Sequence, residues 1–374
     1  MLSMNGPNWF MLLGLLAAAA LCGCLASWGL SHALGVGGRR SVGPAAALVD
    51  WAPTALCVLV AMLLGQPTLA VTLIYATSLA AVTVVLGGAL LFTPDSKDTA
   101  GDITGDVGAD AAGMRPAVAP SSMLSLGLPM AMMVWLIGFS GNVTPASALA
   151  LLIAALAAMD AWAHDAPDSA GGPIIARAAP GSSSFRLFEA AVALGLGLGG
   201  AWMAVAFTRE AAFTREAAYP LLRISPELLV IMPLAPVLLL PLFSRAAGHA
   251  NRGRPTSAVA LALGVVVLNV GVLLPITAVV RHLIPPVLAA TGPSATTVPA
   301  TTAAVVAVTG FDPHMSLLGI PLLLWRLDNM LLVLVALAMF GVRIGYYSPH
   351  RRMGMALLLL YAGYFMMSIV MRLA

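Results

Sequence analysis

The segment VDWAPTALCV, residues 49–58, places an aspartate and a proline inside an apolar run from Val42 to Gly65. A charge at the centre of a lipid bilayer costs about 2.5–3.5 kcal/mol, so Asp50 needs a compensating role. Pro53 has no N–H group and leaves a carbonyl of the preceding helical turn without its usual donor. In membrane proteins an ion or water in a cavity can satisfy such a carbonyl. We therefore expect a helix break at Pro53, close to a polar interior.

The composition identifies an integral membrane protein. Of the 374 residues, 60% are hydrophobic and 9% are charged, whereas soluble domains carry about 25% charged residues. The apolar runs are long enough for spanning helices of about 20 residues, and the short alternating segments of a β-barrel do not appear in the sequence. The arginines are scattered over short loops rather than gathered in a patch, which argues against nucleic-acid binding.

The apolar runs predict an all-α integral membrane fold with about ten transmembrane helices. The expected spans are residues 9–33, 43–64, 69–93, 122–140, 144–162, 186–207, 228–244, 257–280, 316–340 and 353–372. Twelve of the eighteen Lys and Arg residues lie on the odd-numbered loops, so the positive-inside rule places those loops in the cytoplasm. We expect Arg39, Arg115, Arg252 and Arg351 to be cytoplasmic and both termini to be outside. The expected location is a bacterial inner (plasma) membrane.

Two parts of the chain share a pattern that predicts an internal repeat. Ala52-Pro53-Thr54 and Ala235-Pro236-Val237 are each followed, eleven residues after the last member, by a glycine, Gly65 or Gly248. Five spans per copy is an odd number, so the two copies must be inverted, as in many secondary transporters. We expect helix breaks at Pro53 and Pro236.

The polar linkers set the expected domain boundaries. The first five-span repeat covers residues 1–165 and contains an acidic flexible loop at 94–120, a polar linker covers 166–184, and the second repeat covers 185–374 with a Pro/Thr/Ala-rich loop at 283–314. The acidic loop has aspartates four residues apart but no D-x-D-x-D-G pattern, so we expect a solvated loop rather than a calcium loop.

The chain resembles the calcium/cation antiporter superfamily, the sodium/calcium exchanger-like membrane proteins. That family has a G-T-S-x-P-E segment in the second span of each half and a G-S-N stretch, with a further asparagine, in the third. The corresponding segments are Val49–Thr54 and Met232–Val237, then Ala76-Thr77-Ser78 with Ala81 and Gly264-Val265-Val266 with Asn269. The segment LRISPELLVI at 222–231 and the tail from 349 to 373 also resemble the family.

The resemblance implies a cation site built from both halves, but Thr54 and Val237 stand where the family has its two glutamates. A hard dication takes six to eight oxygen ligands, several of them anionic. Sodium/calcium exchange of the ordinary kind is therefore not expected. The candidate cation ligands that remain are Asp50, Thr54, Thr77, Ser78 and Asn269.

Asp50 has two interpretations. It lies one helical turn before Thr54, on the same face, and would serve as a relocated ligand for a proton or a monovalent cation. Alternatively, it is a structural aspartate that stays protonated or pairs with Arg326, one of two other intramembrane charges. Arg326 and Asp328 are two positions apart, so they point to different faces and each should reach a neighbouring helix.

Two functions of different classes follow from this reading. The first is cation antiport with altered or reduced ion specificity, and the second is a transport-inactive scaffold or assembly subunit of a larger membrane complex. The sequence shows no nucleophile–base arrangement and no metal-ligand spacing, so we expect neither an enzyme nor a cofactor. The expected partners are the lipid bilayer and a monovalent cation or proton, and membrane-protein partners remain open.

Overall fold

A computed structural model describes residues 9–34, 43–94, 121–139, 143–165, 183–213, 230–283, 316–317, 320–344 and 349–373. Arg39, Arg115 and most of the three linkers at 94–120, 166–184 and 283–314 lie outside these residues. The helices, in chain order, are α1 (Trp9–Leu34), α2 (Pro44–Leu63), α3 (Pro67–Ala80), the π-helix η1 (Ala81–Val85), α4 (Leu86–Leu90), α6 (Ser121–Phe139), α7 (Pro145–Asp165), α8 (Ser183–Phe213), the π-helix η3 (Val230–Leu234), α10 (Ala235–Leu238), α11 (Leu240–Asn251), α12 (Pro255–Leu268), the π-helix η4 (Asn269–Leu273), α13 (Leu274–Leu283), α15 (Leu322–Arg343) and α16 (Arg351–Leu373).

The expected all-helical membrane class is confirmed. In the described part of the chain, eight helices are long and apolar enough to cross a bilayer. The extended structure described is one short antiparallel pair, β1 (Ser316–Leu317) and β2 (Ile320–Pro321), just before α15. The count of ten spans and the inverted relation of the two halves stay predictions.

The turn after α2 and the turn after α11 have the same construction. Gly65 and Gly253 both have a left-handed backbone, with φ of 69° and 71°. Each is followed two residues later by a proline that begins the next helix, Pro67 or Pro255. In both turns the residue after the glycine donates its N–H to the carbonyl five residues before it, over 2.9 Å for Gln66 and 3.0 Å for Arg254. This helix ending needs a residue without a Cβ at the left-handed position.

The similarity continues along the next helix at a constant offset in residue number. The glycines differ by 253 − 65 = 188, and the prolines by 255 − 67 = 188. Both helices then run for 14 residues before a five-residue π-helical segment, which begins at Ala81 in one copy and at Asn269 in the other. The equal offset supports a duplication, and it pairs Gly65 with Gly253 rather than with the expected Gly248.

The same offset changes the expected matching of the prolines. Pro53 corresponds to Pro241, because 53 + 188 = 241, and Thr54 corresponds to Leu242 instead of Val237. Nothing in the turn geometry pairs Pro53 with Pro236. By this offset η3 and α10 correspond to residues 42–50, the beginning of α2, so the copies differ here in helix continuity, and the match of the two Ala-Pro dipeptides differs from this register by five residues.

The helix break expected at Pro53 is wrong, because α2 runs without interruption from Pro44 to Leu63. A proline leaves the carbonyl four residues before it free, which here is Val49. The Ser27 hydroxyl of α1 donates to that carbonyl over 3.0 Å. An interruption does occur in the other copy, at Leu239 between α10 and α11, three residues after Pro236.

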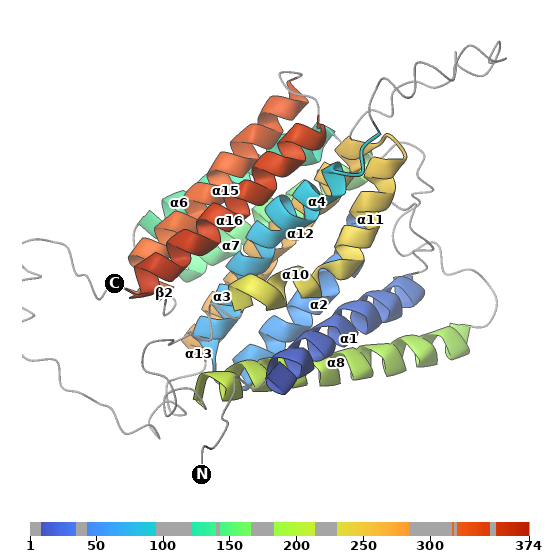
Figure 1. The fold of residues 1–374 in the computed structure, drawn as a ribbon, viewed down its shortest axis with the longest axis vertical. Coiled ribbons are helices and arrows are strands. Elements are labelled where there is room, and N and C mark those ends of the chain that lie inside the picture. Colours follow the sequence, from blue (N-terminus) through green and yellow to red (C-terminus); the bar gives the residue numbers. More distant parts are fainter. Residues whose placement is uncertain are drawn as a thin grey trace, which may run out of the picture.

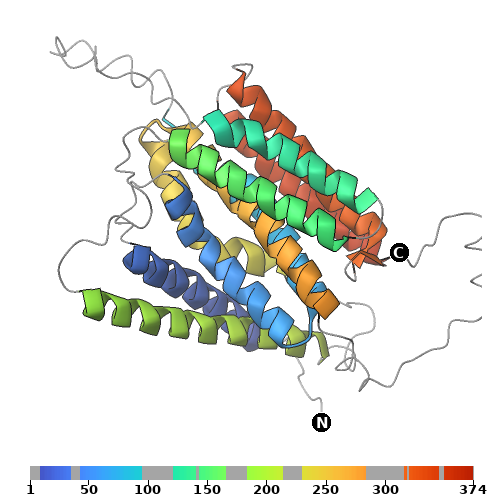
Figure 2. The same cartoon turned by 180° about the vertical axis from the view of Figure 1, so that it is seen from behind.

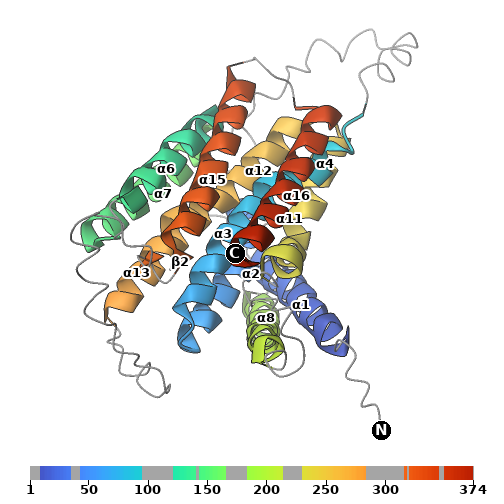
Figure 3. The ribbon, with the colours of Figure 1, turned by 60° about the vertical axis from the view of Figure 1, so that its left-hand side comes forward.

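Helices from both halves surround a central pair. Figure 1 shows α3 and α12 in the middle of the molecule. Helix α10 lies across α3, and α11 runs beside α12. The pair α1 and α8 forms an arm on one side, and α6, α7 and α15 lie on the other (Figure 3). The arm packs closely because its contact positions lack side chains: a Cβ on Gly200 would lie 3.0 Å from the Cys22 nitrogen.

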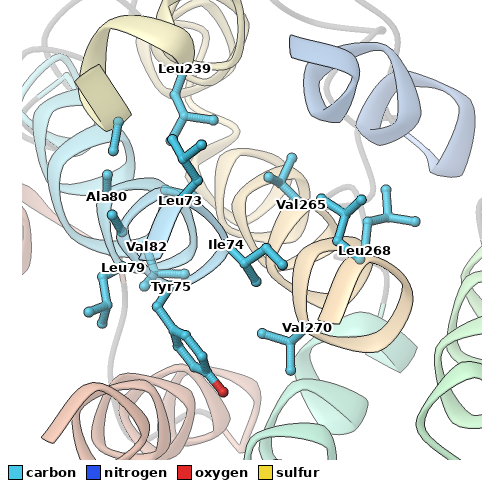
Figure 4. Packing of buried hydrophobic residues seen from close by; sticks show 14 of the residues in the cluster. Leu73, Ile74, Tyr75, Leu79, Ala80, Val82, Leu239, Val265, Leu268 and Val270 are labelled. Carbon is cyan, nitrogen blue, oxygen red and sulfur yellow. The ribbon is translucent and has the colours of Figure 1, made fainter. Parts of the chain in front are cut away.

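The core between α3 and α12 is mostly apolar. Leu73, Ile74, Val265 and Leu268 pack together there, and Leu239 points from the α10–α11 junction toward Leu73 (Figure 4). The interrupted helix is thus held against the central pair by apolar packing. The few polar side chains inside this core define the candidate site.

Candidate cation site

The polar face of α2 carries two fully buried side chains. Asp50 and Thr54 each have a relative exposure of 0% and are one helical turn apart. Neither Asp50 oxygen accepts a hydrogen bond from the residues described, and the Thr54 hydroxyl has no hydrogen-bond partner among them either. A buried oxygen without a hydrogen bond costs about 1–3 kcal/mol, so these polar side chains are not explained by core packing alone.

Arg245 of α11 forms the ion pair with Asp50. Its Nε lies 3.5 Å from Asp50 Oδ2, and its side chain is 11% exposed. The distance is longer than the roughly 2.7–2.9 Å of a charge-assisted hydrogen bond, so the two charges attract each other without sharing a proton. The pair is electrically neutral as a unit, which explains how an apolar core tolerates both groups.

The expected pairing of Asp50 with Arg326 is wrong. Arg326 lies on α15, which packs on α3 and α6, whereas α2 packs against α1, α3, α7, α8, α11 and α12. Arg245 was missed because the seventh span was expected to end at residue 244. The helix continues to Asn251, and Arg245 and the buried His249 therefore share one face of it at a spacing of four residues.

The ion pair lies nearer one face of the membrane than the other. Asp50 comes less than two helical turns after Pro44, where α2 begins, and Arg245 comes less than two turns before Asn251, where α11 ends. At about 1.5 Å per residue, both are roughly 9 Å from those helix ends. Figure 2 shows the beginning of α2 and the end of α11 side by side at the upper left.

A second group of polar side chains lies at the middle of the spans. Asn269 is 14 residues from each end of the segment Pro255–Leu283, and its Nδ2 donates to Thr77 Oγ1 over 3.0 Å and to Ser78 Oγ over 3.2 Å. Both hydroxyls donate their own protons to α3 carbonyls, those of Leu73 and Ile74, over 2.6 Å. The structure therefore brings three of the five candidate ligands together, joining α3 to η4.

Asn269 keeps one atom available. Its Oδ1 is buried and accepts no hydrogen bond from the described residues. Asn269 begins η4, which packs against both α2 and α3, so Thr54 and Asn269 belong to helices in contact. An amide oxygen, a hydroxyl oxygen and a carboxylate from neighbouring helices are oxygen donors of the kind that bind a hard cation.

The remaining predicted charge, Asp328, lies apart from this group. It is 7% exposed on α15, and the Tyr364 hydroxyl of α16 donates to its Oδ1 over 2.8 Å. Across the described residues, no three His, Cys, Asp or Glu side chains come together as a metal site would require.

The comparisons with known proteins bear on the fold. Neither a family model nor a curated protein sequence matches the chain. Two solved structures do. The sodium-calcium exchanger NCX_Mj, soaked with Na⁺ and Sr²⁺, is 14% identical with a TM-score of 0.50, over 94% of this chain and 94% of that one. The H⁺/Ca²⁺ exchanger CAX is 12% identical with a TM-score of 0.52, over 98% of this chain and 91% of that one.

This chain has the cation-exchanger fold. The agreement with two exchangers over nearly the whole chain confirms the fold of the calcium/cation antiporter superfamily. At 12% and 14% identity the likeness concerns the fold alone. What the site binds has to be argued from the side chains that this chain places in it.

Proposed function

We propose that this exchanger-fold protein is a cation antiporter whose site takes a proton or a single monovalent cation instead of calcium. The observation that carries the proposal is the Asp50–Arg245 ion pair. A guanidinium held beside the site's carboxylate occupies the place of a positive charge that would otherwise come from a bound ion.

The balance of charge opposes a divalent cation. The pair contributes one negative and one positive charge, and Thr54, Thr77, Ser78 and Asn269 contribute none. Calcium takes six to eight oxygens, several of them anionic. A dication entering this site would gain one carboxylate and meet the Arg245 charge at close range.

A proton or a monovalent ion requires fewer oxygen ligands and less negative charge than calcium. Protonation of Asp50 would neutralise the carboxylate, and the Arg245 side chain, already 11% exposed, could then move toward water. A monovalent ion would need only a few oxygens, and Thr54 Oγ1 and Asn269 Oδ1 are buried acceptors with no described partner. Competition of both ions for one carboxylate would couple their movements in opposite directions.

The transport-inactive scaffold is the second candidate, and one contact favours it. A Cβ on Gly264 would lie 2.6 Å from the indole ring of Trp162, which is itself fully buried. The ring of α7 thus fills the space beside α12 near the site. A protein that no longer transports would be expected to close its cavity with such packing.

The two candidates are separated by flux measurements in proteoliposomes. Wild-type protein should exchange Na⁺ or K⁺ for protons, read from an internal pH dye, and should not take up calcium. The double variant Asp50→Leu/Arg245→Met removes both charges together and should abolish the flux while the protein remains monodisperse and folded. Asp160→Asn, at a carboxylate whose side chain is 75% exposed, is the control and should transport normally.

Each result decides between the candidates. No flux of any cation from folded wild-type protein would favour the scaffold. Calcium exchange by the wild type would mean that the cation ligands have been assigned to the wrong residues. Unchanged proton-coupled flux in the double variant would overturn the role given to the ion pair. The bacterial inner membrane and the outside position of both termini belong to this same proposal.

A further inference from the structure

A second buried polar cluster joins α3, α15 and α16, outside the candidate cation site. Its centre is Tyr75 of α3, which is 1% exposed and points toward the C-terminal helices (Figure 4). The Trp325 indole N–H donates to the Tyr75 hydroxyl over 2.9 Å, and Asn329 Nδ2 donates to the same oxygen over 3.4 Å. Tyr75 is separated from Thr77 by one residue, so the cluster and the cation site share helix α3.

The cluster contains one carboxylate. Asp328 follows Trp325 by three residues on α15 and accepts a hydrogen bond from Tyr364 of α16 over 2.8 Å. The neighbouring Tyr361 hydroxyl donates to the carbonyl of Ile231 in η3. The cluster therefore links the last helix to the interrupted helix of the second half.

Asn329 leaves one polar atom of this cluster without a described partner. It is 1% exposed, and its Oδ1 has no hydrogen-bond partner among the described residues. Asn329 also lines a small cavity between η1, α6, α12, η4 and α15, whose other lining residues include Val82, Met130 and Val270. A buried acceptor left without a partner costs about 1–3 kcal/mol, so the cluster keeps an unsatisfied polar atom inside the membrane.

Helix α15, which carries Asp328, begins at the end of the bundle opposite to Asp50. Asp328 comes less than two helical turns after Leu322, where α15 begins, which is roughly 9 Å at about 1.5 Å per residue. The strand β2, which leads into α15, contacts α3, and Trp325 reaches Tyr75 only eight residues after the start of α3. Because α3 begins where α2 ends, α15 begins at the end of the bundle opposite to the one near Asp50. Asp328 lies one turn beyond Trp325, and its partner Tyr364 lies mid-way along α16, so the carboxylate itself is toward the middle of the spans.

We propose that Asp328 is a second proton-binding site, buried between α15 and α16, with Tyr364 as its hydrogen-bond partner. The ligand is a proton. A carboxylate buried within a membrane span is a functional candidate by its cost alone, and here it belongs to a hydrogen-bonded cluster beside a cavity. The site uses no residue of the cation site.

The ionisable groups around Asp328 are few. On the elements packed against α15, α3 contributes Tyr75, whereas α6, β1 and β2 contain no ionisable residue in their described ranges. Helix α16 contributes Tyr361 and Tyr364, with Arg351, Arg352 and Arg372 at its ends, and α15 itself carries Arg326 and Arg343. Asp328 is thus the one carboxylate among these described elements.

Infrared difference spectroscopy of the full-length protein in lipid nanodiscs tests the site directly. Between alkaline and acidic pH, wild-type protein should gain a carbonyl band of a protonated, buried carboxyl group. Asp328→Asn should remove that band, and Tyr364→Phe should change its frequency because a hydrogen-bond donor is lost. The exposed Asp160→Asn should leave the Asp328 band in place, and any band that Asp50 contributes should not respond to Tyr364→Phe.

The control for folding is Asp328→Glu, which keeps a carboxyl group and should restore a band at a shifted frequency. A band that persists unchanged in folded Asp328→Asn, or a wild-type spectrum without any band that depends on Asp328, would overturn the proposal. The measurement needs no transport. Failure of the flux experiment would therefore refute the proposed function while leaving this inference standing.

Discussion

The Ser27 hydroxyl of α1 donates to the Val49 carbonyl of α2 over 3.0 Å, at the position that Pro53 leaves free. Nearby, the Cys22 thiol lies 3.9 Å from the Pro53 carbonyl. The arm helix α1 thus supplies the hydrogen bond that the helix cannot make for itself, one residue before Asp50.

Removing this hydroxyl should destabilise the protein. Ser27→Ala leaves a carbonyl unsatisfied in a buried position, so we expect a loss of about 1–3 kcal/mol in the free energy of unfolding. Thermal unfolding in detergent should show a lower midpoint. Ser31→Ala is the matched control, because Ser31 is exposed and bonds only within its own helix, to the Trp28 carbonyl. Equal midpoints for both variants would contradict the role of Ser27.

The Asp50–Arg245 pair should behave as a coupled unit. Asp50→Leu or Arg245→Met alone leaves one charge buried without its partner and should cost about 3–5 kcal/mol. The double variant should recover most of that loss. Chemical or thermal unfolding of all four proteins gives the coupling energy. Arg326→Met added to Asp50→Leu is the control and should recover no stability. Recovery by that change would mean that Asp50 pairs with Arg326 rather than with Arg245.

Asn269 should hold α3 and η4 together. Asn269→Ala removes the donor to Thr77 and Ser78, and the expected loss is about 1–3 kcal/mol, since both hydroxyls keep their own backbone bonds. A lower midpoint of thermal unfolding checks this. Asn251→Ala, at an exposed asparagine at the end of α11, should have no measurable effect.

The topology can be tested with single cysteines after the native three are replaced. The guanidinium of Arg351 donates to the Leu91 carbonyl over 3.0 Å, which places the start of α16 at the end of α4. Cysteines at Arg252 and Arg351 should therefore resist an impermeant thiol reagent added from outside, whereas one at Gln66 should react. The reverse pattern would place both termini in the cytoplasm.

Part of this structure could be predicted from the sequence because it depends on composition. Long apolar runs can cross a bilayer only as helices, so the membrane class followed directly. Asp50 could be singled out because a charge in such an apolar run is costly and needs a compensating role. Asn269, Thr77 and Ser78 were found through a resemblance to a family, and the structure joins them by hydrogen bonds.

The partners of these residues depended on details that apolar runs do not encode. The end of the seventh span was expected at 244 because Arg245 is charged, yet the pairing with Asp50 allows the helix to continue to Asn251. The match of Pro53 to Pro236 relied on a dipeptide, whereas two left-handed glycines relate Pro53 to Pro241. The role of Ser27 required knowledge of which helix lies beside a free carbonyl.

The constant offset between the two glycine turns also shows what the two halves no longer share. Adding or subtracting it relates Asp50 to Leu238 and Arg245 to Cys57, because 50 + 188 = 238 and 245 − 188 = 57. Leucine and cysteine cannot form an ion pair. The Asp50–Arg245 ion pair therefore has no counterpart at the positions that the offset relates to it. The two copies are alike in their backbone turns and differ in the charges placed beside them.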